Sequence, residues 1–156
     1  MTVVAVPMGE AAAGGPGDVL AIYGLGSCVA LAVWDPETRR GVLCHIVLPE
    51  GTPAPGDPPA RFAGPAVDWA VRTLGRVPPR DLVVKLAGGA SVLPTQHVPM
   101  LDIGRRNLDA VFRELARRGM RVAAEDTGGK YGRTVFFHPA DGGLVVRTAG
   151  GKEQVL

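Results

Sequence analysis

The sequence predicts a layered α/β or α+β domain, because strand-like segments dominate it and only two segments carry the period of a helix. Along the chain, a strand-rich segment is followed by a helix, a strand, a second helix and a second strand-rich segment. This order implies helices packed on sheets. The 156 residues suffice to bury a core without disulfides or metals. No linker composition interrupts them, so we expect one domain over residues 1–156.

Turn sequences separate the expected strands. The glycine turn GLGS lies between the strands expected at residues 18–23 and 28–34, and the turn DPET precedes the strand at 39–49. Residues 49–59 hold five prolines and predict a loop, because proline donates no backbone hydrogen bond. DGG at residues 141–143 predicts a hairpin connection, since glycine tolerates positive φ. The other expected strands are residues 3–6, 81–87, 120–126, 133–138 and 143–148.

Two helices are expected, at residues 65–75 and 104–118. Pro65 suits the first position of a helix, Asp102 is a candidate N-cap, and Gly119 is a candidate C-terminal cap. The apolar positions that carry the helical period are Ala66, Ala70 and Leu74 in the first helix and Leu108, Val111, Phe112 and Leu115 in the second.

Composition narrows the class of protein. Hydrophobic residues make up 46% of the chain and charged residues 21%, as in ordinary soluble globular proteins. A net charge of +2 is too small by itself to indicate nucleic-acid binding, and no apolar run reaches the roughly 18 residues of a membrane span. The first ten residues carry no secretory signal pattern. Because two cysteines make no disulfide framework, we expect a cytoplasmic protein with reduced thiols.

Cys28 directly follows the turn formed by Gly24 to Ser27, and two interpretations of it are open. Free cysteines are often small buried hydrophobes. A thiol beside the exposed N–H groups of a glycine turn also gains thiolate character, and such N–H groups stabilise a developing oxyanion. On the second interpretation Cys28 is a nucleophile, and Gly26 and Ser27 form the oxyanion turn.

His45 lies in an apolar strand seventeen positions after Cys28. An antiparallel pairing of the two strands would bring it near the thiol, where imidazole could act as general base and general acid. The alternative is a core histidine. Strand alternation puts Cys44 on the opposite face from His45, so we expect Cys44 to be core packing.

The remaining ionisable residues give weaker signals. The spacing of cysteines and histidines, including His97 and His138, matches no zinc site, so no metal and no cofactor are expected. Arg106, Arg113 and Arg117 lie on one side of the second helix. They predict either a solvated face or a surface for an acidic partner. No aromatic residues interleave them, so nucleic acid is not an expected partner.

Five stretches, in order, resemble the chemoreceptor glutamine deamidase family CheD: GLGSCVALAVWD, HIVLP, KLAGGAS, IGRRN and EDTGGKYGRTV. The resemblance implies a three-layer α/β (α+β) sandwich with mixed β-sheets and two main helices, related to cysteine-dependent deamidase toxins. It implies hydrolysis of glutamine side chains in methyl-accepting chemotaxis receptors to glutamate and ammonia, with Cys28 as the nucleophile and His45 as its base. The phosphatase CheC is an implied partner, and no membrane insertion is implied.

One position departs from the family pattern. The family's third catalytic residue is a threonine six positions before the cysteine, where this chain has Ile22. The hydrogen bond that orients the histidine is then expected to come from a backbone carbonyl or a water, or else activity is weakened. A catalytically impaired adaptor that binds receptors and CheC is therefore the alternative function.

Overall fold

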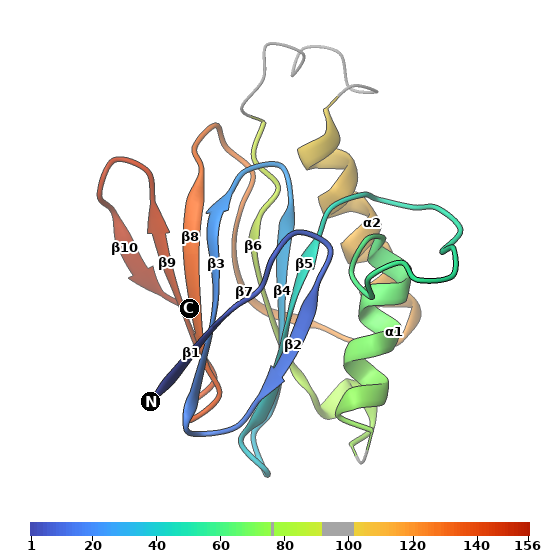
Figure 1. Ribbon diagram of the computed structural model, residues 1–156, viewed down its shortest axis with the longest axis vertical. Helices are drawn as coiled ribbons and strands as arrows, with labels where there is room; N and C mark the ends of the chain where they lie inside the picture. The colour runs from blue at the N-terminus through green and yellow to red at the C-terminus, as the bar shows by residue number, and fades with distance from the viewer. Residues whose placement is uncertain (76, 92–101) are drawn as a thin grey trace.

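The computed structural model describes residues 1–75, 77–91 and 102–156. They form three layers, with two five-stranded sheets stacked face to face and helices α1 and α2 covering only one of them, as Figure 1 shows. This confirms the expected α+β architecture with mixed sheets and two main helices. No helix in the described ranges is long and apolar enough to cross a membrane.

The first sheet, here called sheet A, carries both ends of the chain. It has the strand order β1-β3-β8-β9-β10, and only β1 and β3 pair in parallel. Its strands are β1 (Thr2–Ala5), β3 (Asp18–Leu25), β8 (Arg133–His138), β9 (Gly143–Thr148) and β10 (Glu153–Val155).

The second sheet, sheet B, lies between sheet A and the helices. It has the order β2-β5-β4-β6-β7, with a parallel pair only between β6 and β7. Its strands are β2 (Ala11–Gly14), β5 (Arg40–Ile46), β4 (Val29–Asp35), β6 (Val83–Gly88) and β7 (Val122–Thr127). The expected strands are thus confirmed. The sequence patterns did not predict β2 and β10, which are short, and β2 consists of alanine and glycine.

Helix α1 spans Ala63–Thr73 and α2 spans Ile103–Arg117, each within two residues of its expected bounds. A short 3₁₀ turn, η1, spans Pro79–Asp81. The Asp102 side chain accepts a hydrogen bond from the Arg105 N–H at 3.1 Å, which confirms the N-cap of α2. Gly119 ends this helix with φ at +69°, a conformation that suits glycine.

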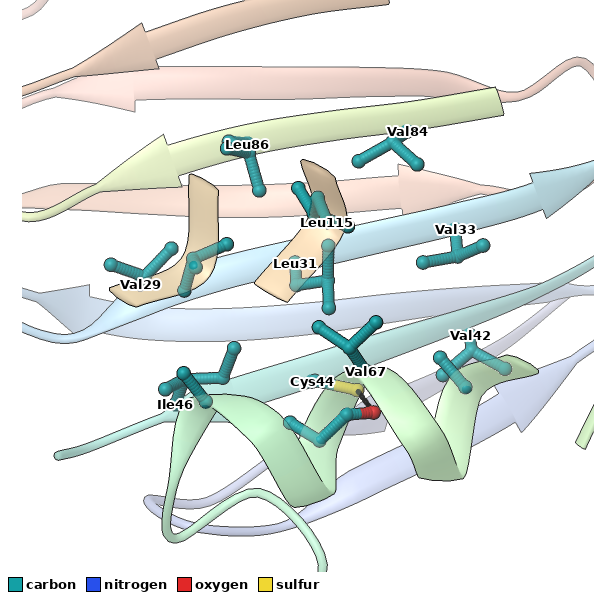
Figure 2. Packing of buried hydrophobic residues seen from close by; sticks show 14 of the residues in the cluster. Val29, Leu31, Val33, Val42, Cys44, Ile46, Val67, Val84, Leu86 and Leu115 are labelled. Atoms are coloured by element: carbon teal, nitrogen blue, oxygen red, sulfur yellow. Dashed lines mark hydrogen bonds between the residues drawn. The ribbon is translucent and has the colours of Figure 1, made fainter. Parts of the chain in front are cut away.

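Two hydrophobic cores follow from strand alternation in sheet B. Between sheet B and the helices, Figure 2 shows Leu31 and Cys44 packed with Val67 and Leu115. Cys44 is fully buried there, and its thiol lies 3.9 Å from the Ala66 carbonyl oxygen, which confirms it as core packing. The opposite face of sheet B meets sheet A around Phe137 and the other residues of the inter-sheet core: Val6, Leu20, Ile22, Leu25, Cys28, Ala30, Ala32, Leu43, Ala87, Val135, Leu144 and Val146.

The glycine turn after β3 carries the chain from one sheet to the other, because β3 belongs to sheet A and β4 to sheet B. The β3–β8 register shifts between Ile22 and Leu25, next to this turn. Such irregularities bend a strand and redirect the chain beyond it. The turn therefore presents Cys28 at the rim of the inter-sheet core.

Replacing Gly41 with alanine is expected to destabilise the sandwich. A Cβ atom at Gly41 would lie 2.4 Å from the Phe137 ring across the inter-sheet core, so one of the two must shift. Overpacking of this kind costs about 1–3 kcal/mol of unfolding free energy. Urea unfolding followed by tryptophan fluorescence measures it.

The matched control is Gly17→Ala. Its Cβ meets nothing within 4 Å, so the change should stay within about 0.5 kcal/mol. Equal unfolding free energies for Gly41→Ala and Gly17→Ala would contradict the packing of the two sheets described here.

Candidate functional site

Cys28 and His45 lie on the same face of sheet B. His45 pairs directly with Ala30 in the antiparallel β4–β5 register, and directly paired residues share a face. Cys28 precedes Ala30 by two residues, and both belong to the inter-sheet core. The two side chains are thus diagonal neighbours, a relation that typically separates Cα atoms by about 7–8 Å.

Both side chains are nearly but not completely buried, with Cys28 7% and His45 5% exposed. Within the described residues no hydrogen bond joins the Cys28 thiol to the imidazole. Catalytic hydrogen bonds are often long before substrate binds and tighten afterwards. The structure therefore makes the two predicted residues neighbours at the edge of the inter-sheet core, where each keeps a small exposed fraction.

A backbone carbonyl orients the imidazole. His45 Nδ1 lies 3.0 Å from the carbonyl oxygen of Val6, just after β1. Because a carbonyl only accepts, the neutral ring must carry its proton on Nδ1, which leaves the Nε2 lone pair free to accept another proton. Ile22 is fully buried in the inter-sheet core and offers no hydroxyl. The Val6 carbonyl is thus the backbone group that supplies the orienting hydrogen bond.

Burial favours the neutral forms of both groups. It raises the pKa of the Cys28 thiol above its ordinary value. Burial also lowers the pKa of His45, and the hydrogen bond to Val6 opposes that shift only in part. The thiol shift runs against the thiolate character expected from the glycine turn. At neutral pH the structure favours a neutral thiol beside a neutral imidazole.

The backbone around Cys28 is held by three hydrogen bonds to successive carbonyls. The Gly26 carbonyl accepts from Ala90 N–H at 3.0 Å, and the Cys28 carbonyl accepts from Gly89 N–H at 2.9 Å. Between them, the Ser27 carbonyl accepts from Asn107 Nδ2 at 3.0 Å. In a trans peptide the N–H points opposite to the carbonyl. The N–H groups of Ser27 and Cys28 therefore point away from the segments that hold the turn.

Glycines allow these segments to approach. Gly88 has φ at +101°, and a Cβ there would lie 2.4 Å from the Cys28 carbonyl oxygen. At Gly104, in the first turn of α2, a Cβ would lie 2.3 Å from the Ala90 carbonyl oxygen. Neither space admits a side chain, since backbone atoms block both. The glycines of KLAGGAS and IGRRN thus serve close packing around Cys28.

The loop after β7 completes this arrangement. Gly128 N–H donates to the Gly88 carbonyl at 2.9 Å, and Ser91 N–H donates to the Gly129 carbonyl at 2.8 Å. The parallel pairing of β6 and β7 places both loops at the same end of sheet B. All five stretches singled out in the sequence, from GLGSC to EDTGG, therefore meet around the turn that carries Cys28.

Asn107 is the site residue that sequence reasoning missed. Its side chain is fully buried, and Nδ2 donates to the Val47 carbonyl at 2.9 Å as well as to Ser27. The signal was its spacing, because Asn107 lies four and eight residues before the buried Val111 and Leu115. A polar residue on the apolar stripe of a helix indicates a specific buried hydrogen bond.

The other predicted residues lie away from the pair. Arg106, Arg113 and Arg117 are exposed on α2, and the latter two form ion pairs with Glu50 at 3.6 Å and Glu114 at 2.9 Å. His97 lies outside the described residues. In the described ranges no group of three histidines, cysteines or carboxylates is placed to hold a metal ion.

The fold and the site define a two-sheet sandwich with one helical layer and a cysteine–histidine pair at the rim of the inter-sheet core. Comparison with known families is consistent with this class. Residues 47–148 match the model of the family CheD, described as CheD chemotactic sensory transduction. This match includes Asn107 and both glycine loops, and it begins two residues after His45.

Curated relatives extend the match over nearly the whole chain. A probable chemoreceptor glutamine deamidase CheD of Symbiobacterium thermophilum is 44% identical over 97% of this chain and 96% of its own. That of Archaeoglobus fulgidus is 39% identical over 88% of each. The chemoreceptor glutamine deamidase CheD of Thermotoga maritima is 37% identical over 88% of this chain and 86% of its own. The chain belongs to the CheD family.

The two cysteines are expected to differ in reactivity. Iodoacetamide should label Cys28 in the folded protein, with a rate that increases above pH 9 because its raised pKa delays thiolate formation. Cys44 is fully buried, and burial raises its pKa to about 12, so its labelling should be on the order of 100-fold slower. Peptide mass spectrometry measures both rates.

The single-thiol variant Cys28→Ser is the control for this experiment. It should remain unlabelled until urea unfolds it. Labelling of Cys44 as fast as Cys28 in the folded protein would contradict the assignment of the two thiols to different cores.

Proposed function

We propose that this protein is a glutamine deamidase that converts glutamine side chains of methyl-accepting chemotaxis receptors to glutamate. The observation that carries the proposal is the placement of Cys28 and His45 on one sheet face, with the imidazole oriented by the Val6 carbonyl. The names of the curated relatives, which specify chemoreceptor glutamine deamidases, support the same activity.

The first half of the reaction forms a thioester. Cys28 Sγ attacks the carbonyl carbon of the glutamine side chain, and the thiol proton moves to His45 Nε2. The amide oxygen becomes an oxyanion, which the N–H groups of Ser27 and Cys28 stabilise. One donor of this kind typically contributes about 3 kcal/mol to the transition state. The C–N bond then breaks, and the nitrogen takes the proton from His45 and leaves as ammonia.

The second half returns the enzyme to its starting state. Water attacks the thioester carbon while His45 Nε2 accepts its proton, and the C–S bond breaks. The proton on His45 then passes to the Cys28 thiolate, and the substrate side chain is released as glutamate. The balance is one glutamine side chain and one water converted to one glutamate side chain and one ammonium ion, because the released carboxylic acid gives its proton to ammonia in water, with no cofactor in any step.

The pKa shifts determine when the proton moves. Because burial raises the pKa of Cys28 and lowers that of His45, the resting pair is neutral. Proton transfer therefore accompanies attack on the amide. His45 therefore acts as a general base that takes the thiol proton during the attack. The resting enzyme does not hold an imidazolium beside a thiolate.

The alternative is a chemotaxis adaptor that binds receptors and CheC without efficient catalysis. Ile22 favours it, because the hydroxyl of the family threonine is missing. The hydrogen bond from His45 Nδ1 to Val6 weakens that argument, since the imidazole is oriented without a hydroxyl at position 22. The exposed arginines of α2 suit either function, as a surface for an acidic partner.

Substitution of the pair should remove ammonia release from receptor fragments. Cys28→Ala loses the nucleophile and is expected to show no release, while His45→Ala should slow the reaction by about 10²–10⁴-fold. Cys44→Ala, on the helix side of sheet B, is the matched control and should retain activity. Equal ammonia release by wild type and Cys28→Ala would remove the nucleophile from the proposal.

Substitution of Ile22 distinguishes the two functions. Ile22→Thr is expected to give no gain in deamidation, because the Val6 carbonyl already accepts a hydrogen bond from His45 Nδ1–H. Burying its hydroxyl should destabilise the fold by about 1–3 kcal/mol. Ile22→Val is the shape-matched control without the hydroxyl. A large gain in turnover for threonine but not valine would show a weakened native site and favour the adaptor.

A further inference from the structure

Asn107 connects the two strand ends that carry the proposed catalytic pair. Its Nδ2 atom donates to the Ser27 carbonyl at 3.0 Å and to the Val47 carbonyl at 2.9 Å. Ser27 immediately precedes Cys28, and Val47 follows His45 by two residues. One side-chain amide from α2 thus bridges the residue two positions before β4 and the residue directly after β5.

We propose that Asn107 is a positioning residue for the deamidation reaction. It holds the Cys28 peptide and the strand that carries His45 in the arrangement that the reaction needs. The inference rests on the proposed function of Cys28 and His45. Asn107 itself is assigned no contact with substrate. Its effect passes through two backbone carbonyls.

The first bond determines where the Cys28 N–H points. The Ser27 carbonyl and the Cys28 N–H belong to one planar peptide and point in opposite directions. Holding the carbonyl against Asn107 therefore aims the N–H toward the other side of the turn, where the oxyanion would form. Without that donor, the hydrogen bonds that described residues make to this turn would be those from Ala90 and Gly89 to the flanking carbonyls.

The second bond restrains the chain beyond His45. Val47 lies past the last residue of β5, Ile46, where ladder hydrogen bonds to β4 have ended. Asn107 donates to the Val47 carbonyl there and ties this segment to the Cys28 turn. A misplacement of about 1 Å between reacting groups can cost about 100-fold in rate, so a restraint here has a direct kinetic consequence.

Packing alone does not explain an amide side chain at position 107, because burying it costs free energy. Asn107 is fully buried, and its Oδ1 atom meets no hydrogen-bond donor in the described part of the chain. Burying an unpartnered acceptor is unfavourable, and an aliphatic side chain like those of Val111 and Leu115 would avoid it. The two donated hydrogen bonds are what an aliphatic residue could not supply.

The test is the pH dependence of Cys28 alkylation by iodoacetamide. In wild type, the neutral imidazole should assist reaction around pH 7.5, while thiolate formed at pH 10.5 reacts without assistance. The rate at pH 7.5 divided by the rate at pH 10.5 measures how strongly the imidazole assists the thiol. A change in how easily iodoacetamide reaches Cys28 alters both rates equally and leaves this ratio unchanged. Asn107→Leu, which removes both donors at similar volume, should lower this ratio by about 10- to 100-fold. Turnover of receptor fragments should fall with it, with a smaller change in KM.

Two further variants complete the design. Val111→Ala, one turn along the same buried face of α2, should lower the melting temperature without changing the ratio or turnover. Asn107→Ser keeps one donor on a shorter side chain and should give an intermediate ratio. A folded Asn107→Leu or Asn107→Ser with the wild-type ratio and turnover would overturn the proposal.

The same measurement separates this inference from the proposed function. His45→Ala should abolish the assisted rate at pH 7.5. If His45→Ala leaves the ratio unchanged, the Cys28–His45 pair itself is wrong. If His45→Ala lowers the ratio but Asn107→Leu and Val111→Ala lower it equally, the effect of Asn107 is one of stability alone and the positioning role is overturned.

Discussion

The antiparallel pairing of β4 with β5 is the constraint on which the site depends. It sets Ala30 opposite His45, so that the imidazole shares a face with Cys28. A slip of one residue would turn His45 toward the helices and bring Cys44 to the inter-sheet side. The pattern of burial opposes such a slip, because Leu31 and Cys44 fill the helix-side core while Ala30 and Leu43 fill the other. The same apolar alternation that stabilises the sandwich therefore aligns the proposed catalytic pair.

Stacking the two sheets then sets the chemistry of that pair. Sheet A covers the face on which Cys28 and His45 lie, and its burial of both groups favours the neutral thiol and the neutral imidazole. The chain at the end of β1 supplies the Val6 carbonyl that orients the ring. Because this contact uses the backbone, it does not depend on a hydroxyl at position 22. A site with an apolar residue at Ile22 can thus still hold its imidazole in the tautomer that accepts a proton.

The glycine-rich stretches act through close packing. Gly88 lets the loop after β6 come within hydrogen-bonding distance of the Cys28 turn, and Gly104 lets the start of α2 come into contact with that loop. Glycine-rich turns in other proteins often present N–H groups to a phosphate. Here the Gly89 N–H donates to the Cys28 carbonyl, and the Ala90 N–H donates to the Gly26 carbonyl. With Asn107, they fix three successive peptide planes, and these planes set the direction of the turn's own N–H groups.

Sequence patterns alone predict the strands of both sheets except β2 and β10, both helices, the cap at Asp102 and the opposite faces of Cys44 and His45. These follow from local periodicity and alternation, which depend on near neighbours in the chain. The sequence also singled out Cys28 and His45, with the family resemblance adding to a local signal that left other interpretations open. The folded chain was needed to show that Val6 orients the imidazole, that Asn107 bridges Ser27 to Val47, and that burial raises the pKa of the Cys28 thiol. These features depend on segments far apart in the chain. Every residue has a backbone carbonyl, and burial depends on the whole fold, so neither can be recognised from residue types.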